Sequence, residues 1–150
     1  MYQEEDVYKI VELFEHKYEL CTELKQSMLA LKKSVQDGEI NEVGVMVGKG
    51  DQYMKEIDKV DKQVSQNKNL LSTLFRDEDN DYSHLVRTNI VKLQGILEEI
   101  SGIHKECLSS VESKTVELKQ NISSIRRGAQ AFRSYVPRPN PPPRFVDTAR

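Results

Sequence analysis

Apolar residues recur at alternating intervals of three and four positions over the first part of the chain. The series is Val7, Ile10, Phe14, Lys17, Cys21, Leu24, Met28, Leu31 and Val35, and only Lys17 in it is polar. Charged residues such as Glu12, Lys25 and Lys32 lie between its members. This spacing places the series on one helix face, as in a coiled-coil seam. It predicts a helix over residues 4–36.

A second series follows a turn at Asp37 and Gly38, where glycine readily takes the left-handed conformation that ends a helix. Its members are Ile40, Val43, Val47, Gly50, Met54, Ile57, Val60 or Asp61, Val64, Leu71 and Phe75. The stretch "VGVMVGKGD" within it is rich in weak helix formers, so a strand is the alternative there. Because the three–four spacing continues through this stretch, we predict one helix over residues 40–75.

A third series follows the polar run "RDEDNDYS", in which Asp81 or Ser83 is expected to cap the next helix. Its members are Val86, Ile90, Leu93, Leu97, Ile100, His104, Cys107, Val111, Thr115, Leu118, Ile122, Ile125, Ala129 and Phe132. They predict a helix over residues 83–134, with a slip in spacing at 111–115 that relaxes a left-handed supercoil. At a rise of about 1.5 Å per residue it is longer than either neighbour, so its last part is expected to lack an intramolecular partner.

These elements predict an all-α fold. We expect an elongated, antiparallel three-helix bundle, coiled-coil-like, over residues 1–134, with a long third helix and an extended proline-rich tail over 135–150. The composition agrees, because 37% hydrophobic and 31% charged residues suit long helices that share a narrow seam better than a compact core. All five prolines lie within residues 137–143, so none interrupts the helices.

The charge of the chain is unevenly distributed. Residues 126–150 hold six Arg, no Lys and one acid, a charge of +5, so a net charge of −2 leaves −7 on the rest. An acidic helical body repels phosphate, which argues against a nucleic-acid-binding protein. No apolar run is long enough to span a membrane, and the acidic start "MYQEEDVYKI" is unlike a signal peptide. We therefore expect a cytoplasmic protein.

Catalytic and metal-binding patterns are absent from the sequence. It contains no GxGxxG, GxxxxGK[ST], GxSxG or HExxH motif, so we expect neither an enzyme nor a bound cofactor. The run "DEDND" lacks the glycine and the final glutamate of a calcium-binding loop. His104 and Cys107 share a helix face but lack a second ligand pair, so we expect both to pack in the seam. Cys21 and Cys107 are expected to be reduced, buried thiols.

The last part of the third series is the candidate binding surface. Its apolar members, which we call the stripe, are Leu118, Ile122, Ile125, Ala129 and Phe132. An apolar stripe without an intramolecular partner needs another chain, either a second copy or a different protein. Tyr135, Phe145 and Val146 are apolar residues of the tail, and we expect them to close over the same surface, with the tail occupying it when no partner is bound.

The proline-rich tail allows a second interpretation. The stretch "PRPNPPPR" favours polyproline II, and Pro139, Pro142 and Arg144 form a PxxPxR arrangement that suits an aromatic-lined groove with acidic flanks. On this alternative the protein is a structural coiled-coil adaptor whose tail recruits a groove-bearing domain. The simpler interpretation is that the same stretch is a spacer that binds no partner.

The layout of the chain resembles the small bacterial flagellar export chaperones of the FlgN/FliT type. The resemblance is carried by the turn Asp37, Gly38, Glu39 and Ile40, by the apolar face that continues to residues 57–60, and by the ending with Tyr135 and "PRFVD". The valine- and glycine-rich second helix and the dense prolines depart from the pattern.

The resemblance implies an all-helical protein that binds amphipathic terminal helices of hook-associated or filament-cap proteins. Such a chaperone prevents premature self-association of its client and delivers it to the type III export apparatus. The mixed seam also leaves a homo-oligomer open, because Val, Phe, Cys and Met at equivalent positions specify an oligomeric state poorly.

Overall fold

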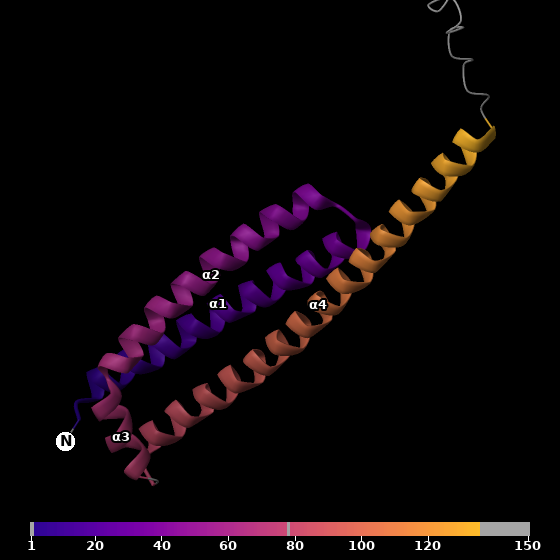
Figure 1. The fold of residues 1–150 in the computed structure, drawn as a ribbon. Helices are drawn as coiled ribbons and strands as arrows, with labels where there is room; N and C mark the ends of the chain where they lie inside the picture. The colour runs from indigo at the N-terminus through magenta and orange to yellow at the C-terminus, as the bar shows by residue number, and fades with distance from the viewer. Residues whose placement is uncertain (1, 78, 136–150) are drawn as a thin grey trace, which may run out of the picture. The chain divides into compact units, whose positions relative to one another are not determined.

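The computed structural model describes residues 2–77 and 79–135, and this part of the chain is all-α, without strands. Its helices are α1 (Glu4–Asp37), α2 (Ile40–Gln66), α3 (Lys68–Arg76) and α4 (Asp81–Tyr135) (Figure 1). The long helices α1, α2 and α4 pack together, and each runs antiparallel to the long helix before it in the chain. α1 and α4 therefore run in the same direction. The chain divides into two compact units, of which the first ends at Lys114 and the second begins at Thr115.

The turn between α1 and α2 is the one that the sequence predicts. Gly38 has a φ of +73°, in the left-handed region where a side chain would be strained. The N–H of Glu39 donates to the carbonyl of Ser34 at 3.0 Å, and the N–H of Gly38 donates to that of Val35 at 3.2 Å. These bonds satisfy carbonyls that the end of α1 would otherwise leave without donors.

The predicted helix over 40–75 is two helices, because the backbone breaks at Asn67. The side-chain amide of Asn67 donates to the backbone carbonyl of Gln63 at 2.9 Å. Asparagine readily offers this alternative to the backbone hydrogen bonds of a helix. The apolar series also skips from Val64 to Leu71, and residues 65–69 are all polar. The stretch "VGVMVGKGD" is helical, as predicted, and lies within α2.

α4 begins at Asp81, two residues earlier than predicted, and its cap is neither Asp81 nor Ser83. The side-chain oxygen of Asn80 accepts a hydrogen bond from the N–H of Tyr82 at 2.9 Å, and its carbonyl accepts from His84 at 3.1 Å. Asn80 therefore caps the helix. Ser83 is buried instead, and its hydroxyl accepts a hydrogen bond from Arg87.

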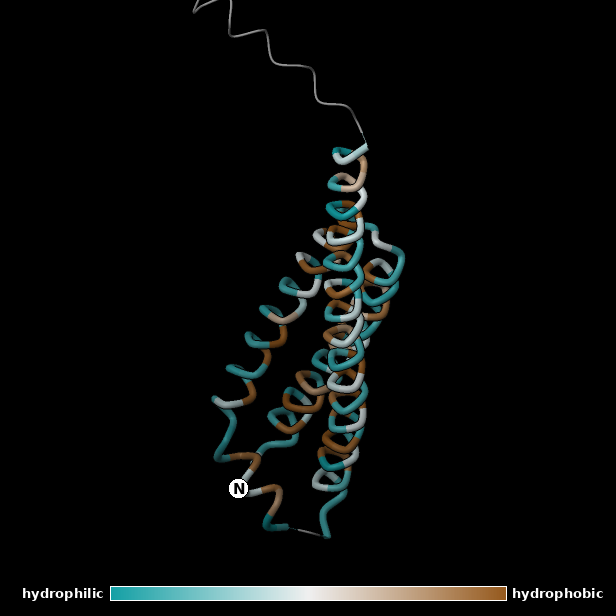
Figure 2. The backbone as a smooth tube through the Cα atoms, turned by 45° about the vertical axis from the view of Figure 1, so that its right-hand side comes forward, coloured by the Kyte–Doolittle hydropathy of each residue, from teal (hydrophilic) through white to brown (hydrophobic). Residues whose placement is uncertain are grey.

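The hydrophobic core lies at the end of the bundle where α1 begins. It brings together the first turns of α1, the short α3 and the start of α4, and hydrophobic residues recur along each of these helices (Figure 2). Its buried members are Val7, Ile10, Val11, Phe14, Leu74, Val86 and Leu93. Lys17, the polar member of the first series, pairs with Asp61 of α2 at 2.6 Å, so the break in that series is occupied by an ion pair.

Ion pairs between α1 and α4 follow the register of these two helices. Lys25 pairs with Glu99, and Lys32 pairs with Glu106, so both pairs join residues 74 positions apart. The lysines are seven residues apart and so are the glutamates, which is the repeat of two parallel helices in a coiled coil. Because the carboxylates are more than half exposed, each pair contributes at most about 1 kcal/mol, and its main effect is on alignment.

The face that α4 turns toward α1 differs in part from the predicted series. Ile96 and Ile103 are buried there together with Leu93 and Cys107, although neither isoleucine belongs to the predicted series. Leu97 and His104, which do belong to it, are exposed, so the prediction of a packed seam histidine is wrong. Both series fit a three–four repeat, and adjacent positions lie only about 100° apart around a helix. The prediction for Cys107 is confirmed.

Burial along α4 ends within the first unit. Cys107 is its last buried residue, and every residue from 115 to 135 is exposed. This loss of burial coincides with the slip in apolar spacing at 111–115. None of the described helices is long and apolar enough to cross a membrane. The tail from residue 136 onward lies outside the described residues.

Candidate functional site

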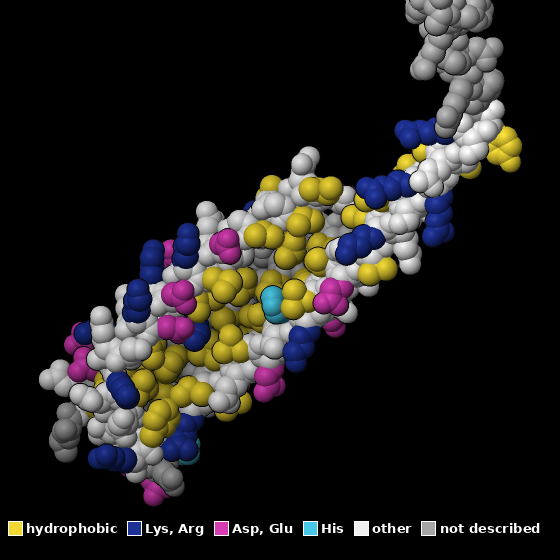
Figure 3. Space-filling model, viewed as in Figure 1, with side chains coloured by type: hydrophobic (Ala, Val, Ile, Leu, Met, Phe, Trp, Pro, Cys, Tyr) yellow, Lys and Arg dark blue, Asp and Glu magenta, His cyan; other side chains and the backbone are white. Residues whose placement is uncertain are grey.

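The first unit contains an apolar groove with α1 at its floor and α2 and α4 as its walls. We call it the groove; its volume is about 470 Å³. Its lining residues are Leu24, Ser27, Met28, Leu31, Met46, Val47, Gly50, Asp51, Met54, Leu97, Ile100, Ser101 and His104. Figure 3 shows hydrophobic side chains gathered on this face between α2 and α4. Val47, Met54 and Leu97 are each about half exposed, so apolar surface here is open to solvent.

The groove contains all three internal methionines of the chain, Met28, Met46 and Met54. Met28 belongs to α1, and Met46 and Met54 belong to separate turns of α2. Methionine is unbranched and polarisable, and surfaces rich in it adapt to apolar partners of different shape. The lining therefore favours a site that accepts apolar side chains without demanding one fixed shape.

The half of α2 that forms a wall of the groove is rich in glycine. Val60 is the one buried residue in α2, and it lies beyond the groove toward the helix end. Added methyl groups at Gly44 and Gly48 would meet no atom within 4 Å, so close packing does not require glycine there. Each glycine inside a helix costs about 0.5–1 kcal/mol relative to alanine. Gly44 and Gly48 therefore lower the intrinsic helix stability of this half of α2.

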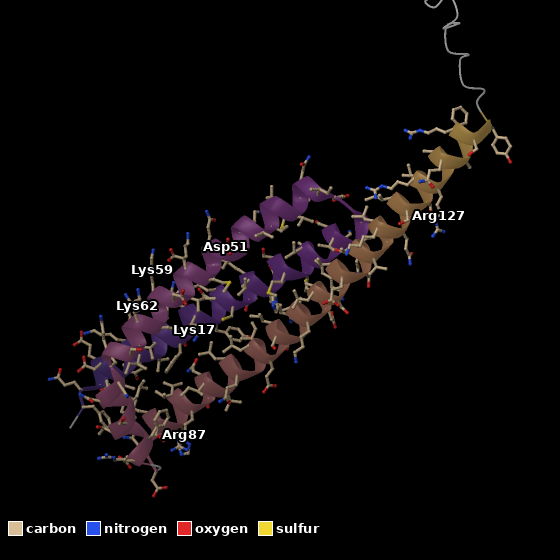
Figure 4. All side chains as sticks on the ribbon, in the orientation of Figure 1. Lys17, Asp51, Lys59, Lys62, Arg87 and Arg127 are labelled. Atoms are coloured by element: carbon tan, nitrogen blue, oxygen red, sulfur yellow. The ribbon has the colours of Figure 1, made fainter. Side chains whose placement is uncertain are left out.

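Few polar groups line the groove. The Ser27 hydroxyl donates to the carbonyl of Met46 at 3.5 Å, so it already has a partner within the site. Asp51 of α2, labelled in Figure 4, and His104 of α4 are the ionisable lining residues. An apolar lining with few polar groups suits the burial of an apolar surface, and the polar groups can orient that surface.

Another hollow, of about 600 Å³, is lined by Leu20 of α1 and by polar and charged residues of α2. Lys59 and Lys62, labelled in Figure 4, are among them. Long lysine side chains in solvent are mobile and cost entropy to fix. The groove is therefore the better candidate for a binding site.

The stripe predicted from the sequence lies on α4 in the second unit, and all five of its residues are exposed. Ile125 is 70% exposed and Phe132 is 69% exposed, which leaves most of both side chains in contact with solvent. Tyr135, the last residue of α4, is also exposed. Phe145 and Val146 lie outside the described residues, so their closing over the stripe stays a prediction.

Sequence reasoning did not identify the groove, because its residues come from three helices and become neighbours only through packing. Met28 and Met54 each belong to a predicted apolar series, whereas Met46 belongs to none. The signal available in the sequence was the restriction of the internal methionines to two helices predicted to pair. Leu97 and His104 were assigned to the interior seam, and the structure places them in the groove instead.

Both cysteines are free and buried, as predicted. Burial raises the pKa of the Cys21 thiol, although nearby Lys17 opposes the rise, and burial likewise raises the pKa of the Cys107 thiol. The Cys107 thiol donates to the carbonyl of Met28 at 3.5 Å, directly behind the groove lining.

We expect both thiols to react slowly with Ellman's reagent. A raised pKa lowers the fraction of reactive thiolate, and packing restricts access, so at about pH 8 the rate should be at least about ten-fold below that in urea. The rate should rise with pH as thiolate forms. Reaction as fast in buffer as in urea would show that the thiols are not protected by the fold.

The described residues thus present an apolar groove in the first unit and the apolar stripe in the second. The groove has the more varied lining, because its residues come from three helices. No protein-family model matches the chain, and neither does any curated protein or solved structure in comparisons of sequence and fold.

Proposed function

We propose that this protein is a binding protein that shelters amphipathic helices of other proteins. Within that class we propose a flagellar type III export chaperone for terminal helices of hook-associated or filament-cap proteins. The observation that carries the proposal is the open groove, with its three methionines and its glycine-rich α2 wall. A client helix would lie between α2 and α4 over α1, with its apolar face toward Met28 and Leu24.

The energetics favour such an occupant. Full burial of one large apolar side chain is worth about 1.5–3 kcal/mol, so a few anchors from a client helix supply substantial binding energy. Part of that energy is lost when a terminal segment becomes ordered on binding. The result is reversible binding, which a chaperone needs in order to release its client.

The flagellar part of the proposal rests on the resemblance in layout. The turn at Gly38 is one of the features that carry the resemblance, and it is present in the structure. The ending "PRFVD", another of these features, lies outside the described residues. A terminal helix of a filament-forming protein has an apolar face that pairs with other copies, and a methionine-lined groove can cover several such faces of different sequence.

The test is a measurement of client self-association. A hook-associated or cap protein, purified with intact terminal segments, should scatter less light over time when an equimolar amount of this protein is present. A client truncated at its terminal helices should gain no protection. Protection of unrelated amphipathic helices alone would support the general class and contradict the flagellar assignment. No protection of any helix would contradict the proposal as a whole.

A further inference from the structure

From residue 118 onward, the described part of the second unit carries basic but no acidic side chains beside its apolar stripe. Residues 118–135 contain no Asp or Glu and four cations, Lys119, Arg126, Arg127 and Arg133. All four side chains are exposed, and none of them takes part in an ion pair among the described residues. The surface therefore combines unpaired positive charge with exposed apolar area.

Three of these cations form a line along one edge of the stripe. Lys119, Arg126 and Arg133 are spaced by seven residues, and we call them the cationic row. With about 100° between successive residues, the stripe covers about 80° of the circumference of α4, and the row runs directly beside it. The opposite edge carries uncharged residues such as Asn121 and Gly128.

Arg127 provides a contrast within the same helix. It is adjacent to Arg126 in sequence, but it lies about 180° around the helix from Leu118. It is labelled on α4 in Figure 4. A partner that covers the stripe and its edge would contact Arg126 and leave Arg127 in solvent.

The same chain shows what pairs with cations at this spacing. Lys25 and Lys32 of α1 are seven residues apart, and they pair with Glu99 and Glu106 of α4, also seven apart. In helix pairs of this kind, charges beside an apolar seam select the partner and its orientation. The cationic row presents the same spacing with three positions.

We propose that the stripe and the cationic row together bind an amphipathic helix of another protein, one with an apolar seam and Asp or Glu at seven-residue intervals along its edge. The seam of that helix packs on Leu118, Ile122 and Ile125. Its acids pair with Lys119, Arg126 and Arg133. This surface is separate from the groove, and the proposal does not depend on the occupant of the groove.

Two other occupants fit the surface less well. In an antiparallel pair of two copies, each cationic row would face the other, and like charges would repel. In a parallel pair, each row would face the opposite edge of the other copy, where Asn121 and Gly128 offer no acid to pair with it. A helix that lies on an anionic membrane presents a broad apolar face with cations on its polar side. The stripe is narrow, and its positive charge is concentrated on one edge.

The experiment uses the whole protein and two designed helical peptides about three heptads long. Both peptides carry a leucine seam; one has Glu at every seventh position beside the seam, and the other has Lys at the same positions. Calorimetry should show at least about ten-fold tighter binding of the Glu peptide, because three charge pairs act together. Added salt should narrow the difference.

Variants then assign the effect to the row. K119E/R126E/R133E should reverse the preference, so that the Lys peptide binds more tightly, whereas the single variant R127E should leave it unchanged. All of these positions are exposed, and circular dichroism checks that the helices persist. Val47→Asp, in the groove, should also leave the preference unchanged.

Several results would overturn the proposal. Equal affinity for the two peptides, or a preference that K119E/R126E/R133E does not reverse, would show that the row does not select the partner. Loss of the preference in Val47→Asp would place the peptide in the groove. Binding to phosphatidylglycerol vesicles, or dimer formation in sedimentation, that disappears in K119E/R126E/R133E while neither peptide binds would assign the surface to a membrane or to a second copy.

Discussion

Replacement of Leu74 with alanine is expected to lower the free energy of unfolding by about 3 kcal/mol. Leu74 is fully buried, at 0% exposure, and it is the one buried residue of the nine-residue helix α3. It packs in the core with Ile10 and Val86, and so joins α3 to the first turns of α1 and α4. The loss combines the missing apolar contacts with the cavity that remains.

Urea denaturation followed by circular dichroism measures this loss. Leu85→Ala is the matched control. It is the same substitution, near the start of α4, but Leu85 is 38% exposed. It should lower the free energy of unfolding by less than about 1 kcal/mol. Equal losses in the two variants would contradict the placement of the core around α3.

Replacement of Val47 with aspartate is expected to weaken the binding of a client helix by about 100-fold. Val47 lines the groove and is 47% exposed, so a bound helix would cover it and bury the new carboxylate against apolar side chains. A buried charge without a partner is strongly unfavourable. The free protein tolerates the same charge, because the carboxylate stays in solvent.

The matched control is Val91→Asp on α4. Val91 is 65% exposed and does not line the groove, so the substitution has the same chemistry at a position that the client does not cover. Calorimetry with a terminal peptide of a hook-associated protein should show unchanged affinity for it, and thermal unfolding should be similar for both variants. Equal weakening by both substitutions would show that the groove is not the binding site.

Local patterns in the sequence predicted much of the fold. The seam from Val7 onward and the turn at Gly38 depend on residues close together in the chain, and both predictions agree with the structure. The break at Asn67 and the cap at Asn80 were missed for a common reason. Each depends on which of several neighbouring polar side chains bonds to the backbone, and composition does not distinguish among them.

The buried face of α4 was predicted only in part, because its apolar residues cover enough of the helix circumference to allow two different seams. Ile96 and Ile103 are buried, and the ion pairs of Lys25 and Lys32 with α4 agree with that register. Leu97 and His104 consequently line the groove. The exposed stripe was predictable because it needs only one helix, whereas the groove needs three helices in a defined register.

If a client helix lies in the groove, as the claim of client binding there requires, it will contact the methionine methyl groups. With methyl-labelled methionine, nuclear magnetic resonance follows Met28, Met46 and Met54 individually, since they come from three separate positions of the lining. Titration with a terminal segment of a hook-associated or cap protein should shift all three signals at the same concentration of peptide, and Val47→Asp should abolish the shifts. Binding measured by calorimetry that leaves all three signals unchanged would contradict the claim.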